Sequence, residues 1–207
     1  MESYKTVLGE AVCSFKEKKS EFIGFCFPVD TESAALAALA KVKALHPMAS
    51  HHVYAYILRQ DNISRFSDDG EPQGTAGLPA LDLLKNLGLR DVCVVIVRYF
   101  GGTLLHTGGL VRAYSKSAKL AAEAAGVGTL FLCEKLSVLL DYSLYRLLLK
   151  RAENMPVKIA DADFGEAVTI TAHVRKDAAA DFCQAIAEIS AGGATVSRLG
   201  EIFCALD

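Results

Sequence analysis

The sequence predicts an α+β protein of two domains. A chain of 207 residues with 52% hydrophobic and 22% charged content is long and apolar enough for two compact cores. In the first half, the uninterrupted β-branched run Val92–Val97 predicts a central strand buried on both faces, and it leads through a glycine-rich loop into a helical pattern. In the second half, the periodicity predicts the order βαββαβ, which is typical of a ferredoxin-like domain. We place the domains at residues 1–134 and 135–207.

The first domain is expected to open with a β-hairpin. Its two strands, roughly Tyr4–Phe15 and Glu21–Val29, flank a charged turn at residues 16–19. Asp30 or Thr31 can cap the alanine-rich helix that follows, and the stripe expected to be buried on that helix is Leu36, Leu39, Val42 and Leu45. The remaining elements are predicted as helix, strand, helix, strand and helix: Thr31–Leu45, His52–Leu58, Pro79–Leu87, Val92–Val97 and Leu110–Ala125.

The second domain is expected to contain four strands and two helices. A short Asp/Gly turn joins the two middle strands, and a Gly192–Gly193 break precedes the last strand. In chain order, the predicted elements are Leu136–Asp141, Tyr142–Asn154, Val157–Ala162, Ala167–Val174, Asp177–Ser190 and Thr195–Cys204.

Two glycine pairs, Gly101–Gly102 and Gly108–Gly109, bracket the loop between the central strand and the next helix. Glycine allows a backbone to approach a ligand closely, and it also allows a loop and a helix to pack tightly against each other. A helix that begins near Thr107 or Gly108 presents unpaired N–H groups, with Arg112 one turn inside it, which indicates an anion site. The loop lacks the spacing of a nucleotide phosphate loop or a dinucleotide fold, so the ligand is not a routine nucleotide.

An acidic turn carries Asp68, Asp69 and Glu71 within four residues, with His51 and His52 upstream. Consecutive Asp and Gly are ordinary turn chemistry, and the acids do not alternate as in a calcium loop, so we predict neither a metal nor a cofactor. The two histidines are adjacent on a strand, so their side chains are expected on opposite faces, and at most one can join the acidic cluster.

Catalysis would require some of the same residues. The candidate catalytic residues are His51, His52, Asp69, Glu71 and His106. No GxSxG, HExxH or SxxK pattern organises them, and no serine or cysteine is placed as a nucleophile. The sequence therefore favours a protein that is not an enzyme.

The composition limits the classes of partner. With 22 basic and 24 acidic residues the net charge is −2, so any contact with nucleic acid must be local. No stretch approaches the roughly 20 apolar residues that span a bilayer, and no signal peptide is apparent. The six cysteines form no CxxC motif and are expected to be reduced core residues. We expect a cytoplasmic protein with no membrane contact.

Three long segments resemble the YigZ/IMPACT family. They are RYFGGTLLHTGGLVRAY at residues 98–114, DDGEPQGTAG at 68–77 and HPMASHHVYAY at 46–56. One departure falls inside the first segment, where His106 stands at a position that is usually glycine in the family. The resemblance otherwise spans essentially the whole chain.

The resemblance implies both a fold and a setting. The first domain is expected to be an α/β sandwich like the second domain of a small-subunit ribosomal protein, and the second domain resembles the ferredoxin-like domains of elongation factor G, which contact the ribosome. Eukaryotic IMPACT proteins modulate a stress-response kinase through its ribosome-associated activator, and they carry a further N-terminal interaction domain. Because this sequence starts at its first predicted strand, that kinase pathway is not expected here.

We therefore predict a binding protein that contacts RNA, the ribosome or a translation factor and modulates translation. Arg65, Arg98 and Arg112 are expected to share one exposed surface beside the glycine loop, unless Arg98 pairs internally with Asp68 or Asp69. Thr75 is expected to face the same cleft or to cap the next helix. Two alternatives remain, a hydrolytic or metal-dependent enzyme and a protein-binding adaptor. The predicted ligand-binding residues are Arg65, Asp68, Thr75, Arg98, Tyr99, Gly101, Gly102, Thr107, Gly108, Gly109, Arg112 and Tyr114.

Overall fold

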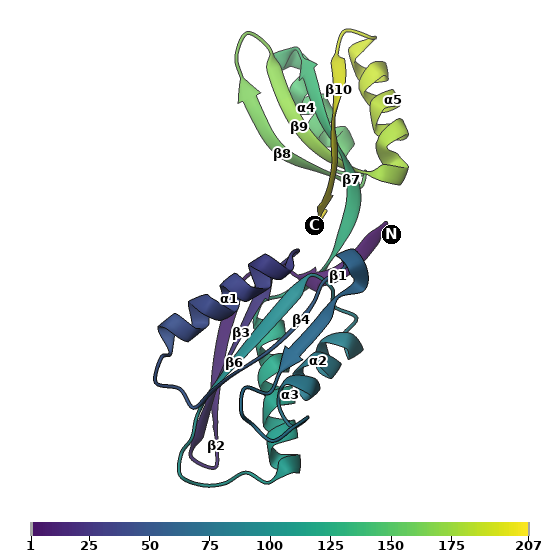
Figure 1. The fold of residues 1–207 in the computed structure, drawn as a ribbon. Helices are drawn as coiled ribbons and strands as arrows, with labels where there is room; N and C mark the ends of the chain where they lie inside the picture. Colours follow the sequence, from purple (N-terminus) through teal and green to yellow (C-terminus); the bar gives the residue numbers. More distant parts are fainter. Residues whose placement is uncertain (1, 207) are drawn as a thin grey trace. The chain divides into compact units, whose positions relative to one another are not determined.

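The computed structural model describes residues 2–206 and has an α+β fold, as the sequence predicts (Figure 1). The chain divides into two compact units, one of Lys5–Gly128 and one of Thr129–Asp207 together with Met1–Tyr4. The boundary predicted between residues 134 and 135 falls inside a long strand, β7 (Val127–Leu140).

The N-terminal unit contains an antiparallel sheet in the order β2–β3–β6–β4–β5. Its strands are β2 (Ala11–Glu17), β3 (Ser20–Pro28), β4 (His51–Ile57), β5 (Ser64–Ser67) and β6 (Val92–Tyr99). The predicted hairpin is present, with Glu17 opposite Ser20 at the turn between β2 and β3. The central position of β6 confirms the prediction from its uninterrupted apolar run.

Each face of this sheet carries its own hydrophobic core. Helix α1 (Glu32–Leu45) covers the face that includes Val95, whereas α2 (Gly77–Asn86) and α3 (Thr107–Ala124) cover the face that includes Ile96 (Figure 1). Because side chains alternate along a strand, β6 supplies both cores and is buried from Val92 to Arg98. A short 3₁₀ turn, η1 (Gln60–Asn62), precedes β5.

The prediction for the start of the chain was wrong in one respect. Tyr4–Phe15 is not one strand but two, β1 (Ser3–Val7) and β2, which belong to different sheets. The break lies at residues 8–10, where the amides of Leu8 and Gly9 donate to the carbonyls of Gly126 and Ala125 instead of continuing a strand ladder.

The stripe predicted to be buried on α1 was also partly wrong. Leu36 and Leu45 are 48% and 61% exposed, while the buried positions are Ala35, Ala38 and Val42. Small alanine side chains at the contact let the helix lie close to the sheet. The predicted cap is present, because the Thr31 hydroxyl accepts from the amide of Ala34.

The C-terminal unit has the predicted βαββαβ order. It comprises β7, α4 (Tyr142–Ala152), β8 (Val157–Phe164), β9 (Val168–Arg175), the turn η2 (Lys176–Ala178), α5 (Ala179–Ser190) and β10 (Thr195–Cys204). The sheet runs β10–β7–β9–β8 and is antiparallel throughout, and β1 also pairs with β7. Leu148 of α4 and Phe182 of α5 pack against one face of this sheet.

Within residues 2–206, no helix combines the length and the apolar character that a membrane-spanning helix needs.

Candidate ligand-binding site

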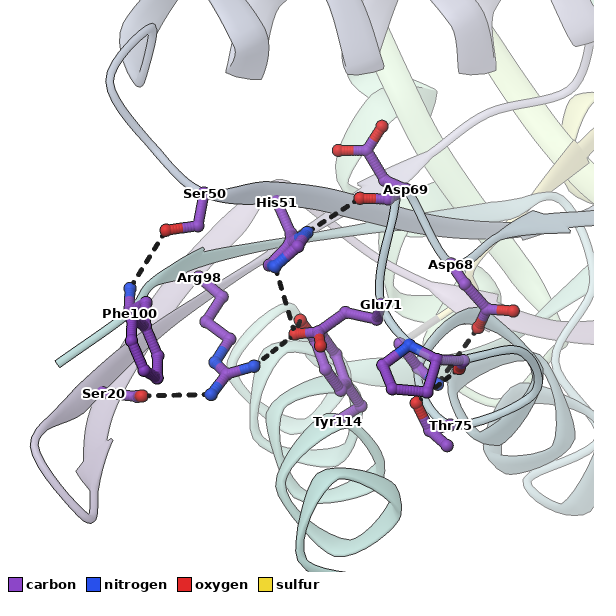
Figure 2. Close-up of polar contacts among 12 residues, drawn as sticks. Ser20, Ser50, His51, Asp68, Asp69, Glu71, Thr75, Arg98, Phe100 and Tyr114 are labelled. Atoms are coloured by element: carbon purple, nitrogen blue, oxygen red, sulfur yellow. Dashed lines mark hydrogen bonds and ion pairs between the residues drawn. The ribbon is translucent and has the colours of Figure 1, made fainter. Parts of the chain in front are cut away.

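A buried cluster of charged and polar side chains lies beside the glycine loop (Figure 2). Its centre is the carboxylate of Glu71, which follows β5. Arg98 Nη1 donates to Glu71 Oε1 over 2.6 Å, and the Tyr114 hydroxyl donates to the same oxygen over 2.7 Å. Tyr114, on α3, is fully buried, and burial followed by the hydrogen bond to Glu71 raises its pKa far above the ordinary value. Tyr114 therefore stays neutral and acts as a donor.

Arg98 connects this cluster to the β2–β3 turn. Its Nη2 atom donates to the hydroxyl of Ser20 over 3.2 Å, and the amide of Gly101 donates to the same hydroxyl over 3.4 Å. The guanidinium group also lies over the rings of Phe22 and Phe100. Its Nε atom is buried without a hydrogen-bond partner among the described residues. Nothing in the sequence pattern indicated a role for Ser20.

The burial of Arg98 contradicts the predicted surface of three arginines. Arg98 is only 4% exposed and is paired, whereas Arg65 and Arg112 are exposed. An internal pair for Arg98 was the alternative, but its partner is Glu71 rather than Asp68 or Asp69.

Asp68 has a structural role that explains its place in the turn. Its Oδ1 atom accepts from the amides of Ala76 and Gly77 over 3.1 and 2.8 Å, and Oδ2 accepts from the amide of Gly74 over 2.8 Å. These amides include the first ones of α2, whose N-cap residue supplies no side-chain bond. Asp68 therefore caps α2 from a turn that precedes it in the chain.

Thr75 does not cap α2. Its hydroxyl donates to the carbonyl of Pro72 over 2.6 Å, and its side chain is nearly buried. Of its two predicted roles, capping belongs to Asp68 instead.

Asp69 makes hydrogen bonds with both His51 and His52. Its Oδ2 atom accepts from the amide of His52 over 2.6 Å, and its carbonyl lies 2.8 Å from Nδ1 of His51. Since a carbonyl only accepts, Nδ1 of His51 carries the proton, and Nε2 faces Glu71 Oε1 at 3.8 Å. The ring of His52 has Nε2 3.0 Å from the carbonyl of His46 and Nδ1 3.9 Å from Asp69 Oδ2. Both histidine rings therefore contact the acidic turn, and the prediction that at most one could join it was wrong.

The predicted catalytic residues converge only in part. Glu71 and His51 meet, but the carboxylates of Asp68 and Asp69 are occupied by backbone amides. His106 is an exposed residue at the N-cap of α3. Among residues 2–206, no three His, Cys, Asp or Glu side chains are arranged to hold a metal ion.

The glycines of the loop serve different purposes. A Cβ on Gly101 would lie 1.9 Å from the carbonyl oxygen of Lys19, so the protein itself occupies the space that this glycine frees. Gly102 has a φ of +79°, which favours glycine. A Cβ on Gly108 would meet only Arg112 Nη1 at 3.7 Å, which is ordinary contact. Gly102 and Gly108 thus face more open space than Gly101, and Gly108 lies at the start of α3, where Thr107, Gly108 and Gly109 were expected to approach a ligand.

A basic pocket of about 250 Å³ lies between the β2–β3 hairpin and the first turns of α3. Lys18, Arg112 and Lys116 line it together with Phe15 and Gly109. The three basic side chains are exposed and form no ion pair within the described part of the chain, and Lys116 Nζ lies 4.5 Å from the centre of the Phe15 ring. Glu17 is the single acidic residue in the lining. Lys18 belongs to the turn that the sequence showed only as a charged hairpin turn.

Most of the predicted ligand-binding residues do not line this pocket, and Arg65 and Tyr99 make contacts elsewhere. Arg65 is on β5, where it donates to the carbonyl of Ser64. The hydroxyl of Tyr99 lies 3.0 Å from Nδ1 of His46, which places this half-buried tyrosine in an internal contact. Among the predicted ligand-binding residues, Gly109 and Arg112 of α3 line the basic pocket.

Comparison with known proteins gives a consistent picture. The Impact N-terminal domain matches residues 18–122, and the domain of unknown function DUF1949 matches residues 138–192. The chain is 32% identical over 203 residues to the IMPACT family member YvyE of Bacillus subtilis, covering 98% of this chain and 93% of that protein. It is 48% identical over 100 residues to YigZ of Escherichia coli, covering 47% of this chain and 49% of that protein. A crystal structure of a hypothetical protein aligns with a TM-score of 0.62 and 31% identity, covering 95% of this chain and 97% of that one.

Proposed function

The chain belongs to the IMPACT family, and from this premise we propose that it is a binding protein that contacts RNA or the ribosome through its basic pocket and thereby modulates translation. The link to translation comes from the family resemblance. The choice of ligand class comes from the pocket between the β2–β3 hairpin and α3.

The observation that carries the proposal is the set of exposed cations in this pocket, none of which forms an ion pair within the described part of the chain. Lys18, Arg112 and Lys116 come from two elements and line one hollow, with a single acid, Glu17, among them. The protein as a whole is slightly acidic, so this local excess of positive charge is not a consequence of composition. Lysine and arginine groups that converge without acidic partners fit the phosphates of a nucleic acid backbone.

The start of α3 adds to the positive potential at the pocket. The first N–H groups of a helix have no partner within it and carry partial positive charge. The side chain of Arg112 lies beside Gly108, which belongs to the first turn of α3. Gly109, the next residue, lines the pocket itself. Phe15 is half-buried beneath Lys116 and offers an aromatic face at the edge of the pocket.

The buried cluster has a supporting role in this proposal. Arg98 ties the end of β6 to Ser20, and Ser20 is bonded to the amide of Gly101. Through these bonds, the cluster holds the hairpin turn and the glycine loop in fixed positions, and both segments adjoin the pocket. We therefore assign Glu71, Arg98 and Tyr114 to positioning rather than to ligand contact.

The alternatives receive less support. An enzyme that uses the acidic turn would need free carboxylates, but Asp68 and Asp69 accept hydrogen bonds from backbone amides. The names of the relatives YvyE and YigZ indicate no enzymatic activity. An adaptor or a single translation-factor protein would be favoured by an apolar surface, whereas the pocket is basic. The C-terminal unit is proposed as a docking platform because of its resemblance to ribosome-contacting ferredoxin-like domains.

The test is binding to structured RNA and to ribosomal particles across a series of salt concentrations. The variant Arg112→Gln/Lys116→Gln removes two charges from the pocket. The control variant Lys43→Gln/Lys85→Gln removes two exposed charges elsewhere that form no ion pair with the described residues. We expect the pocket variant to bind at least about tenfold more weakly, with a salt slope smaller by about two, because each lost phosphate contact lowers the slope by about one. The control variant should bind as the parent does.

Circular dichroism must show that both double variants are folded. If the two variants bind equally well, or if the parent protein binds neither RNA nor ribosomal particles at any salt concentration, the proposed function is wrong.

A further inference from the structure

We propose that Cys133 and Cys204 form a reversible disulfide when the protein meets a hydroperoxide, so that this thiol pair is an oxidative modification site. The pair lies in the C-terminal unit, and the proposal does not depend on RNA binding.

The sheet register brings the two cysteines together. In the antiparallel pairing of β7 and β10, Cys133 lies opposite Ile202, and Cys204 lies opposite Phe131. Residues two positions apart on a strand share a face, so Cys133 and Cys204 are diagonal neighbours on one face of the sheet. Their sulfur atoms are 3.5 Å apart. A disulfide needs a sulfur–sulfur distance of about 2.05 Å, so the sulfurs must approach by about 1.5 Å. Because diagonal neighbours in a sheet are about 7–8 Å apart, the end of β10 must also move toward β7 as the bond forms.

The two thiols differ in accessibility. Cys133 is fully buried, and its burial, followed by the hydrogen bond from Cys204, raises its pKa to about 12. Cys204 is half-buried near the end of β10. Because the thiolate is the reactive form and access limits its reaction, a small oxidant reaches Cys204 first. Cys133 then lies in contact with the sulfur that has been oxidised.

No other two cysteine sulfurs make such a contact among the described residues. Cys26 and Cys93 are buried, and burial raises the pKa of each to about 12. Cys183 is half-buried on α5, and burial raises its pKa as well. Cys183 therefore resembles Cys204 in exposure but has no partner thiol, which makes it a matched control.

The reaction balances with the hydroperoxide as the only oxidant. The Cys204 thiolate attacks the peroxide oxygen, the O–O bond breaks, and Cys204 becomes a sulfenic acid while hydroxide, or an alkoxide, leaves and takes up a proton. The sulfur of Cys133 then attacks the sulfenic sulfur, which forms the S–S bond and breaks the S–O bond, and the hydroxide that leaves takes up the Cys133 proton to become water. Two thiols lose two electrons in total, and hydrogen peroxide is reduced to two molecules of water.

The disulfide would fix one end of an edge strand. Within residues 2–206, β10 pairs only with β7, and a bulge between Arg198 and Gly200 interrupts their register. A bond from Cys204 to Cys133 would hold the segment beyond this bulge against β7, independently of the hydrogen bonds between the strands.

The test treats the reduced full-length protein with one equivalent of hydrogen peroxide at mildly alkaline pH and then alkylates the remaining thiols after denaturation. We expect the number of alkylated cysteines to fall from six to four, with the mass of two hydrogen atoms lost before alkylation. Peptide mapping should find the segments around Cys133 and Cys204 linked, and dithiothreitol should restore all the thiols.

Three variants identify the site. Cys204→Ser should form no intramolecular disulfide, and Cys133→Ser should accumulate a sulfenic acid at Cys204 that dimedone traps. Cys183→Ser should form the Cys133–Cys204 disulfide as the parent does. The proposal is overturned if the parent keeps six alkylated cysteines, if Cys183 is oxidised before Cys204, or if the only disulfide formed joins two chains.

Discussion

The guanidinium of Arg98 and the carboxylate of Glu71 form an ion pair 2.6 Å long, although the two side chains are only 5% and 4% exposed. Arg98 ends the central strand β6, and Glu71 lies in the acidic turn after β5, so the pair joins two segments far apart in the sequence (Figure 2). Buried charges are tolerated only when they are paired and hydrogen-bonded. The contacts of Tyr114 and Ser20 supply these additional hydrogen bonds.

Replacing Glu71 with glutamine should strongly destabilise the N-terminal unit. Glu71→Gln keeps the size of the side chain but leaves the Arg98 charge buried without a counter-ion. We expect a loss of about 3–5 kcal/mol in the free energy of unfolding, measured by urea denaturation.

The matched control is Glu10→Gln, because Glu10 pairs with Lys41 but is 61% exposed. An exposed pair contributes about 1 kcal/mol or less. Equal effects from the two glutamine variants would show that the Arg98–Glu71 pair is not the stabilising contact we describe.

Asp68→Ala should weaken the start of α2. Three backbone amides lose their acceptor, and loss of a helix cap costs about 2 kcal/mol. The amides of Gly74, Ala76 and Gly77 should exchange with deuterium faster than in the parent. Asp82→Ala serves as the control, since Asp82 is an exposed residue of the same helix and makes no side-chain bond within the described residues. If Asp82→Ala accelerates exchange as much, then Asp68 is not the cap.

The sequence was most informative where structure is set by local pattern. The apolar run of β6, the cap at Thr31 and the start of α3 at Thr107 all depend on neighbours within a few residues. The split of Tyr4–Phe15 into two strands depends instead on partners more than 80 residues away in the sequence. The amides of Leu8 and Gly9, in the break, donate to the carbonyls of two residues at the end of α3. Periodicity within the segment contains no information about those partners.

The roles within the acidic turn could not be predicted for a related reason. Asp68, Asp69 and Glu71 are close in sequence, but Asp69 and Gly70 both have positive φ, which turns consecutive side chains in different directions. The carboxylate of Asp68 accepts from an amide at the start of α2, and that of Asp69 accepts from an amide of β4. The carboxylate of Glu71 accepts from the guanidinium group of Arg98 on β6. Which acid pairs with Arg98 is decided by this backbone geometry, and the sequence prediction accordingly chose the wrong two acids.

Gly101→Ala and Gly108→Ala should have opposite outcomes although both residues belong to the glycine loop. A Cβ at position 101 would overlap the backbone of Lys19 at 1.9 Å, so the hairpin turn or the loop must move. We expect a loss of about 1–3 kcal/mol, as in overpacked sites, measured by thermal denaturation. At position 108, in the first turn of α3, alanine makes only ordinary contacts and favours the helix, so stability should be unchanged or slightly higher.

If Gly101→Ala is as stable as the parent, the close approach of the loop to Lys19 is wrong.

His173 should titrate below its ordinary pKa. It lies on β9 between Lys135 of β7 and Lys158 of β8, directly opposite each in the sheet register. Burial, followed by repulsion from these two lysines, lowers the pKa of His173 below 6.5. Replacing the exposed Lys158 with glutamine should therefore raise the pKa of His173, but not fully to 6.5, because burial remains the largest cause. NMR titration of the ring proton, assigned by its absence in His173→Gln, measures the shift.

The sign of the effect on stability follows from the same shift. As the pH falls below about 6.5, the unfolded chain takes up a proton at His173 before the folded chain does, so folding stability decreases in that range and is unaffected above it. His173→Gln should remove this contribution to the pH dependence of the unfolding free energy. Lys150→Gln, an exposed position on α4, should leave the His173 titration unchanged. A His173 pKa at or above 6.5 in the parent would mean that the two lysines do not act on the ring as the register indicates.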